Sequence, residues 1–507
     1  MIDDSEIRRL ALGCFLPGFV GETPPGWLLQ GLADGLGGVV LFGSNLGDGS
    51  DVDQLTNKLR ASAGRDLVLA LDEEGGDVTR LDTVRGSAVP GSAALGWLDD
   101  AAATEEVYAS IGGRLAEAGV TLNLAPVADV NVDPRNPVIG VRSFSADPPV
   151  AARQVAAAIR GLQRTGVAAC AKHFPGHGAT SADSHHEVAT VDRPLDQLRE
   201  VELAPFRAAI GAGTRAVMTG HLLVPALDDK IATVSHPITT GLLRDTLGFE
   251  GAVVTDALEM KAVSGTMGMV EGFVRALIAG ADAIETGALD YPELLDEIPQ
   301  AVLAAVHSGW LSVERLSDAA ARTSRLARPG DPQAGYDTAV VSGIAARCVE
   351  VRGSLPPLQR PLVLECRSPN GMATGDLPWS LADRIAGRTP GTDVQLVQGP
   401  VDAEQFRSRA EGRPLVAVIR DPGRNPWQSD VVDAAVGHAA AGRPAVLVDL
   451  GWPAELSGAA AELPVVRTRG IAPGLLDAAA ELLTGVRSAG RLTQPCRRPP
   501  PRGAPGC

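Results

Sequence analysis

The first 300 or so residues repeat one pattern, in which a short apolar segment ends at a polar residue and a stretch with helical spacing follows. Apolar segments that alternate with helices predict parallel strands buried on both faces of a sheet. Roughly eight such units fit an α/β fold of the (β/α)8 TIM-like barrel type better than an open doubly wound sheet. The predicted strands are the segments 12–19, 37–42, 66–71, 121–127, 167–170, 216–219, 251–255 and 281–284. The predicted helices include 51–63, 104–118, 148–165, 194–210, 237–247 and 271–279.

A barrel of this kind collects the carboxyl ends of its strands on one rim, where the active sites of this fold lie. No GxGxxG or GxxxxGK[ST] pattern follows a predicted strand, which disfavours an open nucleotide-binding sheet. We therefore expect the polar residues at the strand ends to converge. These residues are Asp72, Asp129, Lys172, His173, His221, Asp256 and Glu285. For His221 and Glu285, a purely structural role toward neighbouring loops stays open beside a functional one.

The sequence divides into four predicted parts. Residues 1–330 form the barrel, residues 331–349 form a linker, and residues 350–486 form a smaller three-layer α/β domain. The second domain has strand patterns but no dense cluster of catalytic residue types, which favours a structural or docking role. Its predicted strands are 361–365, 415–420, 444–449 and 463–467. The tail 487–507 is rich in proline and arginine and is expected to be disordered.

Charge and cysteine content disfavour several classes of function. The 507-residue chain has a net charge of −16 and a pI near 5.0, which argues against nucleic acid or an anionic membrane as partner. Its six cysteines are scattered without a CxxC pair, as is usual for free thiols in a reducing compartment. No basic and then apolar signal segment opens the chain, and no segment has the ~20 apolar residues of a membrane span. We expect a cytoplasmic protein of unknown oligomeric state.

The stretch from Lys172 to His186 carries the densest set of reactive side chains. Lys172 and His173 end a predicted strand, and the Pro- and Gly-rich loop that follows carries Asp183 and His185. A carboxylate two residues from an imidazole can fix its tautomer, so that His185 can act as acid and base near neutral pH. A solvent-exposed polar loop is the alternative interpretation of this spacing.

The crowding of His173, His177, His185 and His186 suggests a zinc site as a further alternative. However, the segment between His173 and His177 is Phe-Pro-Gly and cannot form one helix face. Neither a cysteine nor a Glu-x-x-His motif accompanies these histidines. We therefore expect no metal and no cofactor.

An acidic rim with lysine and histidine indicates a ligand that carries many hydroxyl groups, because carboxylates accept hydrogen bonds from hydroxyls. Retaining cleavage of a glycoside requires a nucleophilic carboxylate and a proton donor on either side of the glycosidic bond. Asp256 follows a Val-Val-Thr strand and would be held on rigid backbone, as a nucleophile requires. The alternative for Asp256 is a helix N-cap, since the residues from 258 onward can be helical.

Five motifs occur in order along the chain. They are LDEEGGDVTR at 71–80, NLAPVADV at 123–130, VIGVRSF at 138–144, KHFPGHG at 172–178 with DSH at 183–185, and VTDALEM at 254–260. Together they resemble the bacterial β-N-acetylglucosaminidases of glycoside hydrolase family three over about residues 5–330. The resemblance implies a retaining exo-glycosidase that releases terminal β-linked N-acetylglucosamine, typically from peptidoglycan fragments in cell-wall recycling.

By motif position, the resemblance assigns Asp256 as the nucleophile, His185 as the general acid/base and Asp183 as the dyad partner of His185. It assigns Asp72 to the outer hydroxyl groups of the sugar and leaves Asp129 with either a structural or a direct role. The sugar pocket would be completed by Arg80, Arg142, Lys172 and His173. The implied partner is a small carbohydrate or muropeptide.

Three departures from the family pattern are evident. Asp77 stands where Arg or another polar residue is frequent, without an obvious consequence, and the segment 264–272 is short and apolar. Glu285 places an acid where a hydrophobic residue is more usual. The alternative activities are a phosphorylase, since a histidine repels phosphate less than a carboxylate does, a β-glucosidase of the same family, and a catalytically silent sugar-binding protein.

Overall fold

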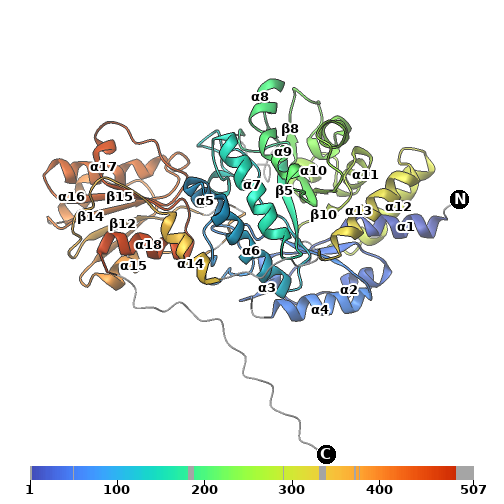
Figure 1. Ribbon diagram of the computed structural model, residues 1–507, viewed down its shortest axis with the longest axis horizontal. Coiled ribbons are helices and arrows are strands. Elements are labelled where there is room, and N and C mark those ends of the chain that lie inside the picture. The colour runs from blue at the N-terminus through green and yellow to red at the C-terminus, as the bar shows by residue number, and fades with distance from the viewer. Residues whose placement is uncertain are drawn as a thin grey trace, which may run out of the picture.

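The protein is described from a computed structural model, which covers residues 3–49, 51–180, 188–288, 290–330, 338–369, 371, 373–375, 377–410 and 412–486. The chain forms two lobes along its long axis, the first coloured blue to yellow and the second orange to red (Figure 1). Each lobe is built around a sheet with helices packed on it. No helix in these ranges is both long and apolar enough to cross a bilayer.

The first lobe contains a curled, parallel sheet of short buried strands. Six of them form one sheet in the order β2-β3-β4-β5-β7-β9, and β1 pairs in parallel with β10. A parallel bridge from Val254 to Ala283 connects β9 with the start of β10, and the Val40 amide donates to the Pro17 carbonyl at 3.1 Å. The strands are β1 (Phe15–Leu16), β2 (Gly38–Leu41), β3 (Val68–Leu71), β4 (Leu122–Asn123), β5 (Ala168–Phe174), β7 (Ala216–Thr219), β9 (Ala252–Thr255) and β10 (Ile284–Glu285). Each overlaps a strand predicted from the sequence.

Helices cover the outside of this sheet (Figure 1). They are α1 (Asp4–Gly13), α2 (Gly26–Asp34), α3 (Gly43–Leu46), α4 (Val52–Ala63), α5 (Ser92–Leu98), α6 (Ala101–Glu117), α7 (Pro148–Gln163), α8 (Leu195–Glu200), α9 (Leu203–Gly211), α10 (Lys261–Ser264), α11 (Met269–Ala279), α12 (Leu294–His307) and α13 (Val313–Leu326). Shorter elements are the 3-10 turns η1 (Gly140–Arg142) and η2 (Ala232–Val234), the π-helix η3 (Pro237–Thr246), and the strand pair β6 (Ala189–Thr190) and β8 (Leu222–Leu223).

Local sequence explains how these helices begin and pack. The Asp100 carboxylate accepts hydrogen bonds from the amides of Ala102 and Ala103 and so caps α6. A Cβ at Gly161 of α7 would lie 2.2 Å from the Glu105 carbonyl oxygen, so only glycine permits the close contact between α6 and α7. The predicted single helix 194–210 is wrong, because the chain forms α8 and α9 with a break at Val201. Pro205 has no amide hydrogen to donate to the Val201 carbonyl, which interrupts the helix there.

The second lobe is a mixed sheet between two helical layers. Its strand order is β11-β16-β15-β14-β12-β13, and only β11 is antiparallel, to β16. The strands are β11 (Glu350–Arg352), β12 (Leu362–Cys366), β13 (Asp393–Val397), β14 (Leu415–Ile419), β15 (Ala445–Asp449) and β16 (Val465–Arg467). The helices are α14 (Thr338–Arg347), α15 (Leu381–Arg388), α16 (Ala403–Ala410), α17 (Ser429–Ala440) and α18 (Pro473–Thr484), with turns η4 (Pro426–Gln428) and η5 (Gly458–Glu462). Alternate strand residues pack against α15 and α18 on one face and α16 and α17 on the other.

The structure differs from two expectations for this half of the chain and leaves a third, the tail, untested. The predicted linker 331–349 contains a helix, α14, which packs against α6 and α18. Val341, Ile344, Ala345 and Cys348 are buried at helical spacing, so an apolar face and not a linker composition governs this segment. Strands β11 and β13 were not predicted; β13 is an edge strand with mostly half-exposed residues, so it lacks a continuous apolar pattern. The predicted tail 487–507 lies outside the described residues.

Buried polar contacts join the two lobes. Asp77, in the loop after β3, accepts hydrogen bonds from Arg420 Nη2 at 2.9 Å and from the Ile471 amide at 2.8 Å. Arg80 Nη1, from the same loop, donates to the Ala373 carbonyl at 3.1 Å. The departure at Asp77, which had no evident consequence in the sequence, therefore lies at the contact between the lobes.

Candidate active site at the strand ends

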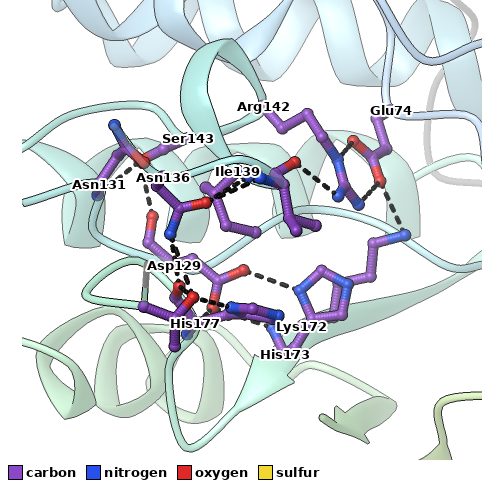
Figure 2. A network of polar contacts seen from close by, with 12 residues as sticks. Glu74, Asp129, Asn131, Asn136, Ile139, Arg142, Ser143, Lys172, His173 and His177 are labelled. Carbon is purple, nitrogen blue, oxygen red and sulfur yellow. Dashed lines mark hydrogen bonds and ion pairs between the residues drawn. The ribbon is translucent and has the colours of Figure 1, made fainter. Parts of the chain in front are cut away.

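The carboxyl ends of the strands in the first lobe collect charged side chains, as expected for a parallel sheet. Asp72 follows β3, Lys172 and His173 lie in β5, Asp256 follows β9, and Glu285 ends β10. The loops after β3 and β4 add further polar residues, which Figure 2 shows in contact with Lys172 and His173. The strands are rigid and fully buried, so they fix the positions of these groups.

A buried network of opposite charges forms one side of this site (Figure 2). Arg142 binds Glu74 through Nε and Nη2 at 2.9 and 2.7 Å, and Lys172 Nζ contacts the same carboxylate at 2.8 Å. Burial raises the pKa of Glu74, but the attraction of Arg142 and Lys172 outweighs burial and leaves this pKa below its ordinary value. Burial lowers the pKa of Lys172, but Asp72 and Glu74 reverse that effect, so its pKa is raised. All three groups are therefore charged at neutral pH.

Asp72 lies at the open edge of this network. Lys172 Nζ also contacts Asp72 Oδ1, and Arg80 Nη2 lies 3.8 Å from Asp72 Oδ2. Asp72 and Arg80 are only partly buried, whereas Lys172 and Arg142 are buried. A carboxylate held by two cations at an accessible edge can accept hydrogen bonds from the hydroxyl groups of a polyol.

A second network orients His173. Asp129 Oδ2 lies 2.7 Å from His173 Nδ1, and Asp129 Oδ1 accepts hydrogen bonds from the amides of His173 and His177. The acceptor at Nδ1 favours the tautomer with hydrogen on that nitrogen and directs Nε2 away from Asp129. Asp129 thus has a structural contact with His173, and a direct role of Asp129 toward a ligand stays a prediction.

His177 completes this second network, and its ring centroid lies 6.0 Å from that of His173. Its Nδ1 lies 2.6 Å from Thr180 Oγ1, and its carbonyl accepts a hydrogen bond from Asn136 Nδ2 at 2.9 Å. Burial lowers the pKa of His177 to about 4, so the ring is neutral at neutral pH. Asn136 also accepts from the amides of Val138 and Ile139 and so holds the loop that carries Arg142.

Asp256 lies in a tight turn at the end of β9. Its amide donates to the Thr219 carbonyl at 3.0 Å, and its Oδ1 accepts from the Ala257 amide at 2.9 Å. No helix begins at Asp256; the next helix, α10, starts at Lys261, so the N-cap alternative is wrong. His221 Nδ1 lies 2.8 Å from Thr233 Oγ1 and its Nε2 lies 3.0 Å from the Ala257 carbonyl, which supports this turn.

The structure joins four of the eight predicted site residues, places His173 and Asp256 at strand ends of the same sheet, and leaves two undescribed. Asp72, Arg80, Lys172 and Arg142 form one connected charged group through Glu74. Asp183 and His185 fall in the segment 181–187, outside the described residues, so their roles stay predictions. Within the described ranges no cluster of three His, Cys, Asp or Glu side chains suits a metal, but His185 and His186 are not among them.

Glu74 is the contact that reasoning from the sequence missed. It stands in the acidic run 72–74, where only Asp72 was assigned a role. Strand β3 ends at Leu71, so Glu74 lies in the following loop and strand alternation in the sequence cannot indicate that it faces the same site as Asp72. Glu73, between them, turns away and accepts hydrogen bonds from Thr79, Arg80 and Leu81.

Comparison with known proteins decides the family. Residues 30–326 match the N-terminal domain of glycosyl hydrolase family 3, which is more than half of the chain. The chain belongs to glycoside hydrolase family 3. This membership confirms the resemblance drawn from the five motifs, and the chain is a glycoside hydrolase.

Several relatives illustrate the similarity. The chain is 35% identical to beta-hexosaminidase A of Pseudoalteromonas piscicida over 317 residues, 57% of this chain and 53% of that protein. It is 35% identical to a beta-hexosaminidase of Neisseria meningitidis serogroup C, covering 52% of this chain and 74% of that one. Among solved structures, a family 3 beta-N-acetylglucosaminidase from Paenibacillus sp. str. FPU-7 matches with a TM-score of 0.83 and 32% identity, covering 94% of this chain and 96% of that one. The chain thus spans about half the length of the first relative and nearly all of the solved structure.

Proposed function

We propose that this protein is a retaining exo-β-N-acetylglucosaminidase that releases terminal β-linked N-acetylglucosamine. The observation that carries the proposal is the accessible carboxylate Asp72, held by Lys172 and Arg80 at the same strand-end edge as Asp256. A hydroxyl-rich ligand bound at Asp72 would place its reacting carbon near a second carboxylate, as glycoside cleavage requires. The names of the relatives, beta-hexosaminidase and beta-N-acetylglucosaminidase, support the choice of sugar.

In the proposed mechanism Asp256 attacks the anomeric carbon and the glycosidic bond breaks. His185 would donate a proton to the leaving oxygen, and Asp183 would fix the imidazole tautomer. Water then attacks the glycosyl ester of Asp256, and His185 takes up the proton that water loses. Lys172, Arg142 and His173 would hold the sugar, with Asp72 as the acceptor for its outer hydroxyls.

The proposal extends to the architecture and setting of the enzyme. We propose that β1 to β10 form a closed (β/α)8 barrel within residues 1–330 and that residues 350–486, preceded by helix α14, form the second α/β domain. The Val254 bridge and the Val40 hydrogen bond, at the two ends of the six-stranded sheet, support closure. Peptidoglycan fragments are the proposed source of substrate, in the cytoplasm.

The decisive experiment compares the 4-nitrophenyl β-N-acetylglucosaminide with the β-glucoside, using wild type, Asp256→Ala and His185→Ala. We expect the first substrate to be preferred and both variants to lose about 100-fold or more in kcat. Mass spectrometry of wild type treated with a slow-reacting fluorinated glycoside should find the sugar on the peptide that contains Asp256. Labelling of another carboxylate would contradict the assignment of the nucleophile.

Phosphorolysis and simple sugar binding are separated by the same assay. Added phosphate that accelerates turnover and yields a sugar 1-phosphate would identify a phosphorylase with the same residues. Preference for the β-glucoside would identify a β-glucosidase. Binding of N-acetylglucosamine without cleavage of either substrate would leave a silent sugar-binding protein.

A further inference from the structure

Glu285 is the acidic residue that ends strand β10. Its side chain is only 4% exposed. Its backbone holds the turn of Asp256 from both sides: the Glu285 amide donates to Thr255 Oγ1 at 3.2 Å, and the Glu285 carbonyl accepts from the Leu258 amide at 3.0 Å. The residue is therefore fixed to the segment that carries the proposed nucleophile.

The contacts of Glu285 disfavour an ionised carboxylate. Its Oε2 is buried and has no hydrogen-bond partner among the described residues. Burying an ionised oxygen without a hydrogen-bond donor costs the free energy of its lost hydration. Burying the carbonyl oxygen of a neutral acid without a donor costs less free energy. The charge around it is mainly negative and increases that cost.

The charged groups that act on Glu285 belong to three strands or the segments that follow them. They are Asp256 and Glu259 after β9, Asp72 after β3, and Lys172 on β5, and Glu285 in turn acts on the buried thiol of Cys170, also on β5. Three of the four charged groups are acids, and the single cation, Lys172, is already in contact with Asp72 and Glu74. Burial, followed by Asp256 and Asp72, raises the pKa of Glu285 well above its ordinary value.

We propose that Glu285 is a positioning residue that keeps its proton at working pH, so that Asp256 is the ionised member of a coupled pair of carboxyl groups. Two neighbouring carboxyls that cannot both ionise separate into one that is acidic and one that is not, and the nucleophile must be the first. An ionised Glu285 would repel Asp256 and compete with Asp72 for Lys172. The inference rests on the proposed role of Asp256 as nucleophile.

The test is infrared difference spectroscopy of the full-length protein without substrate. At neutral pH, wild type minus Glu285→Gln should show the carbonyl stretch of a neutral carboxylic acid, with the shift to lower frequency that deuterium exchange produces. As the pH rises, this band should disappear at least about one pH unit earlier in proteins that carry Asp256→Asn than in those that keep Asp256, because the negative charge of Asp256 is gone. Absence of the band at neutral pH would overturn the proposal.

Asp449→Asn is the matched control for the spectrum. Asp449 is also a fully buried acid, and burial raises its pKa to about 7, but it lies on β15 in the second lobe. Its titration should not change in Asp256→Asn. An equal shift at Asp449 would mean that the effect is general and would refute a specific coupling to Glu285. Because no turnover is needed, this result stands apart from the outcome of the substrate assay.

A kinetic measurement tests the positioning role. With a 2,4-dinitrophenyl glycoside, whose leaving group departs without a proton, the high-pH limb of kcat/KM does not depend on His185. At high pH we expect kcat/KM of the wild type to fall about tenfold per pH unit. In Glu285→Gln this fall should begin at least about one pH unit higher. A fall of kcat/KM at the same pH in both proteins would contradict the positioning role of Glu285.

Discussion

Arg142 binds both carboxylate oxygens of Glu74, at 2.7 and 2.9 Å, and this buried pair joins the loop after β3 to the turn η1. Lys172, on β5, contacts the same carboxylate at 2.8 Å, so three segments of the chain meet at Glu74. Two cations and one carboxylate, with Asp72 as the second acid, leave the network close to neutral. Such a set is stable only while each member remains.

Glu74→Gln should therefore cost both stability and activity. The change leaves Arg142 and Lys172 with less compensating charge in a buried site, and we expect the free energy of unfolding to fall by about 3–5 kcal/mol. Urea denaturation measures this change. The control is Glu106→Gln: Glu106 pairs with Arg164 through two hydrogen bonds of similar length but is 37% exposed, and about 0.2–1 kcal/mol is expected there. Equal losses at the two sites would refute the importance of burial.

Asp129→Asn should lower activity through His173. The amide cannot replace the carboxylate as acceptor for both Nδ1 and two backbone amides, so the ring loses its orientation. A displacement on the order of 1 Å at a substrate-positioning group costs about 100-fold in kcat/KM. Asp133→Asn is the control, because Asp133 binds Arg135, which is 72% exposed, near the same loop. A wild-type rate in Asp129→Asn would show that His173 is held by other means.

His177 should make the fold sensitive to acid. Burial lowers its pKa from 6.5 to about 4, so the unfolded chain binds a proton that the folded chain does not between these two values. Stability from this group is complete above about pH 6.5 and is lost as the pH falls toward about 4, by roughly 3 kcal/mol in total. Denaturation curves at several pH values should show a shallower dependence for His177→Gln. Parallel curves for the two proteins would contradict the assignment.

Asp77→Asn should weaken the contact between the lobes. Arg420 is 7% exposed and loses the charge of its partner, with an expected cost of about 3–5 kcal/mol. Calorimetry should then show separate transitions for the two lobes, or a larger separation than in wild type. Asp100→Asn removes another ion pair between the lobes, with Arg347, but that pair is exposed and asparagine preserves the cap of α6. A similar effect in both variants would argue against a special role for Asp77.

Strand positions and site residues differed in how far the sequence could predict them. The eight strands of the curled sheet overlap predicted segments because these segments are mainly apolar and most end near a polar residue, whereas the two-residue strands β6 and β8 were not predicted. The edge strand β13, with Asp393 and Gln395, carries no such pattern. The sequence also placed Asp72 and Lys172 correctly at one edge, because both follow or end parallel strands.

Long-range partners could not be predicted in the same way. Glu74 and Arg142 are 68 residues apart, and Asp77 and Arg420 are 343 apart, and nothing in local spacing links them. The role of Asp129 required the distance to His173 Nδ1, since a buried acid in a loop fits several functions. Glu285 was visible as an unusual residue, but its unpartnered oxygen and acidic neighbours are features of the folded chain.

Arg80 reaches in two directions, with Nη2 toward Asp72 and Nη1 on the Ala373 carbonyl of the second lobe. The first lobe consequently depends on contacts with the second lobe and is not expected to function alone. A version truncated near residue 330 would free the Arg80 guanidinium that lies beside Asp72, the proposed sugar-binding acid, and would expose Asp77 where Arg420 now covers it. Chimeras that exchange the second lobe between relatives should preserve activity only when the incoming lobe offers a backbone oxygen at the position of Ala373.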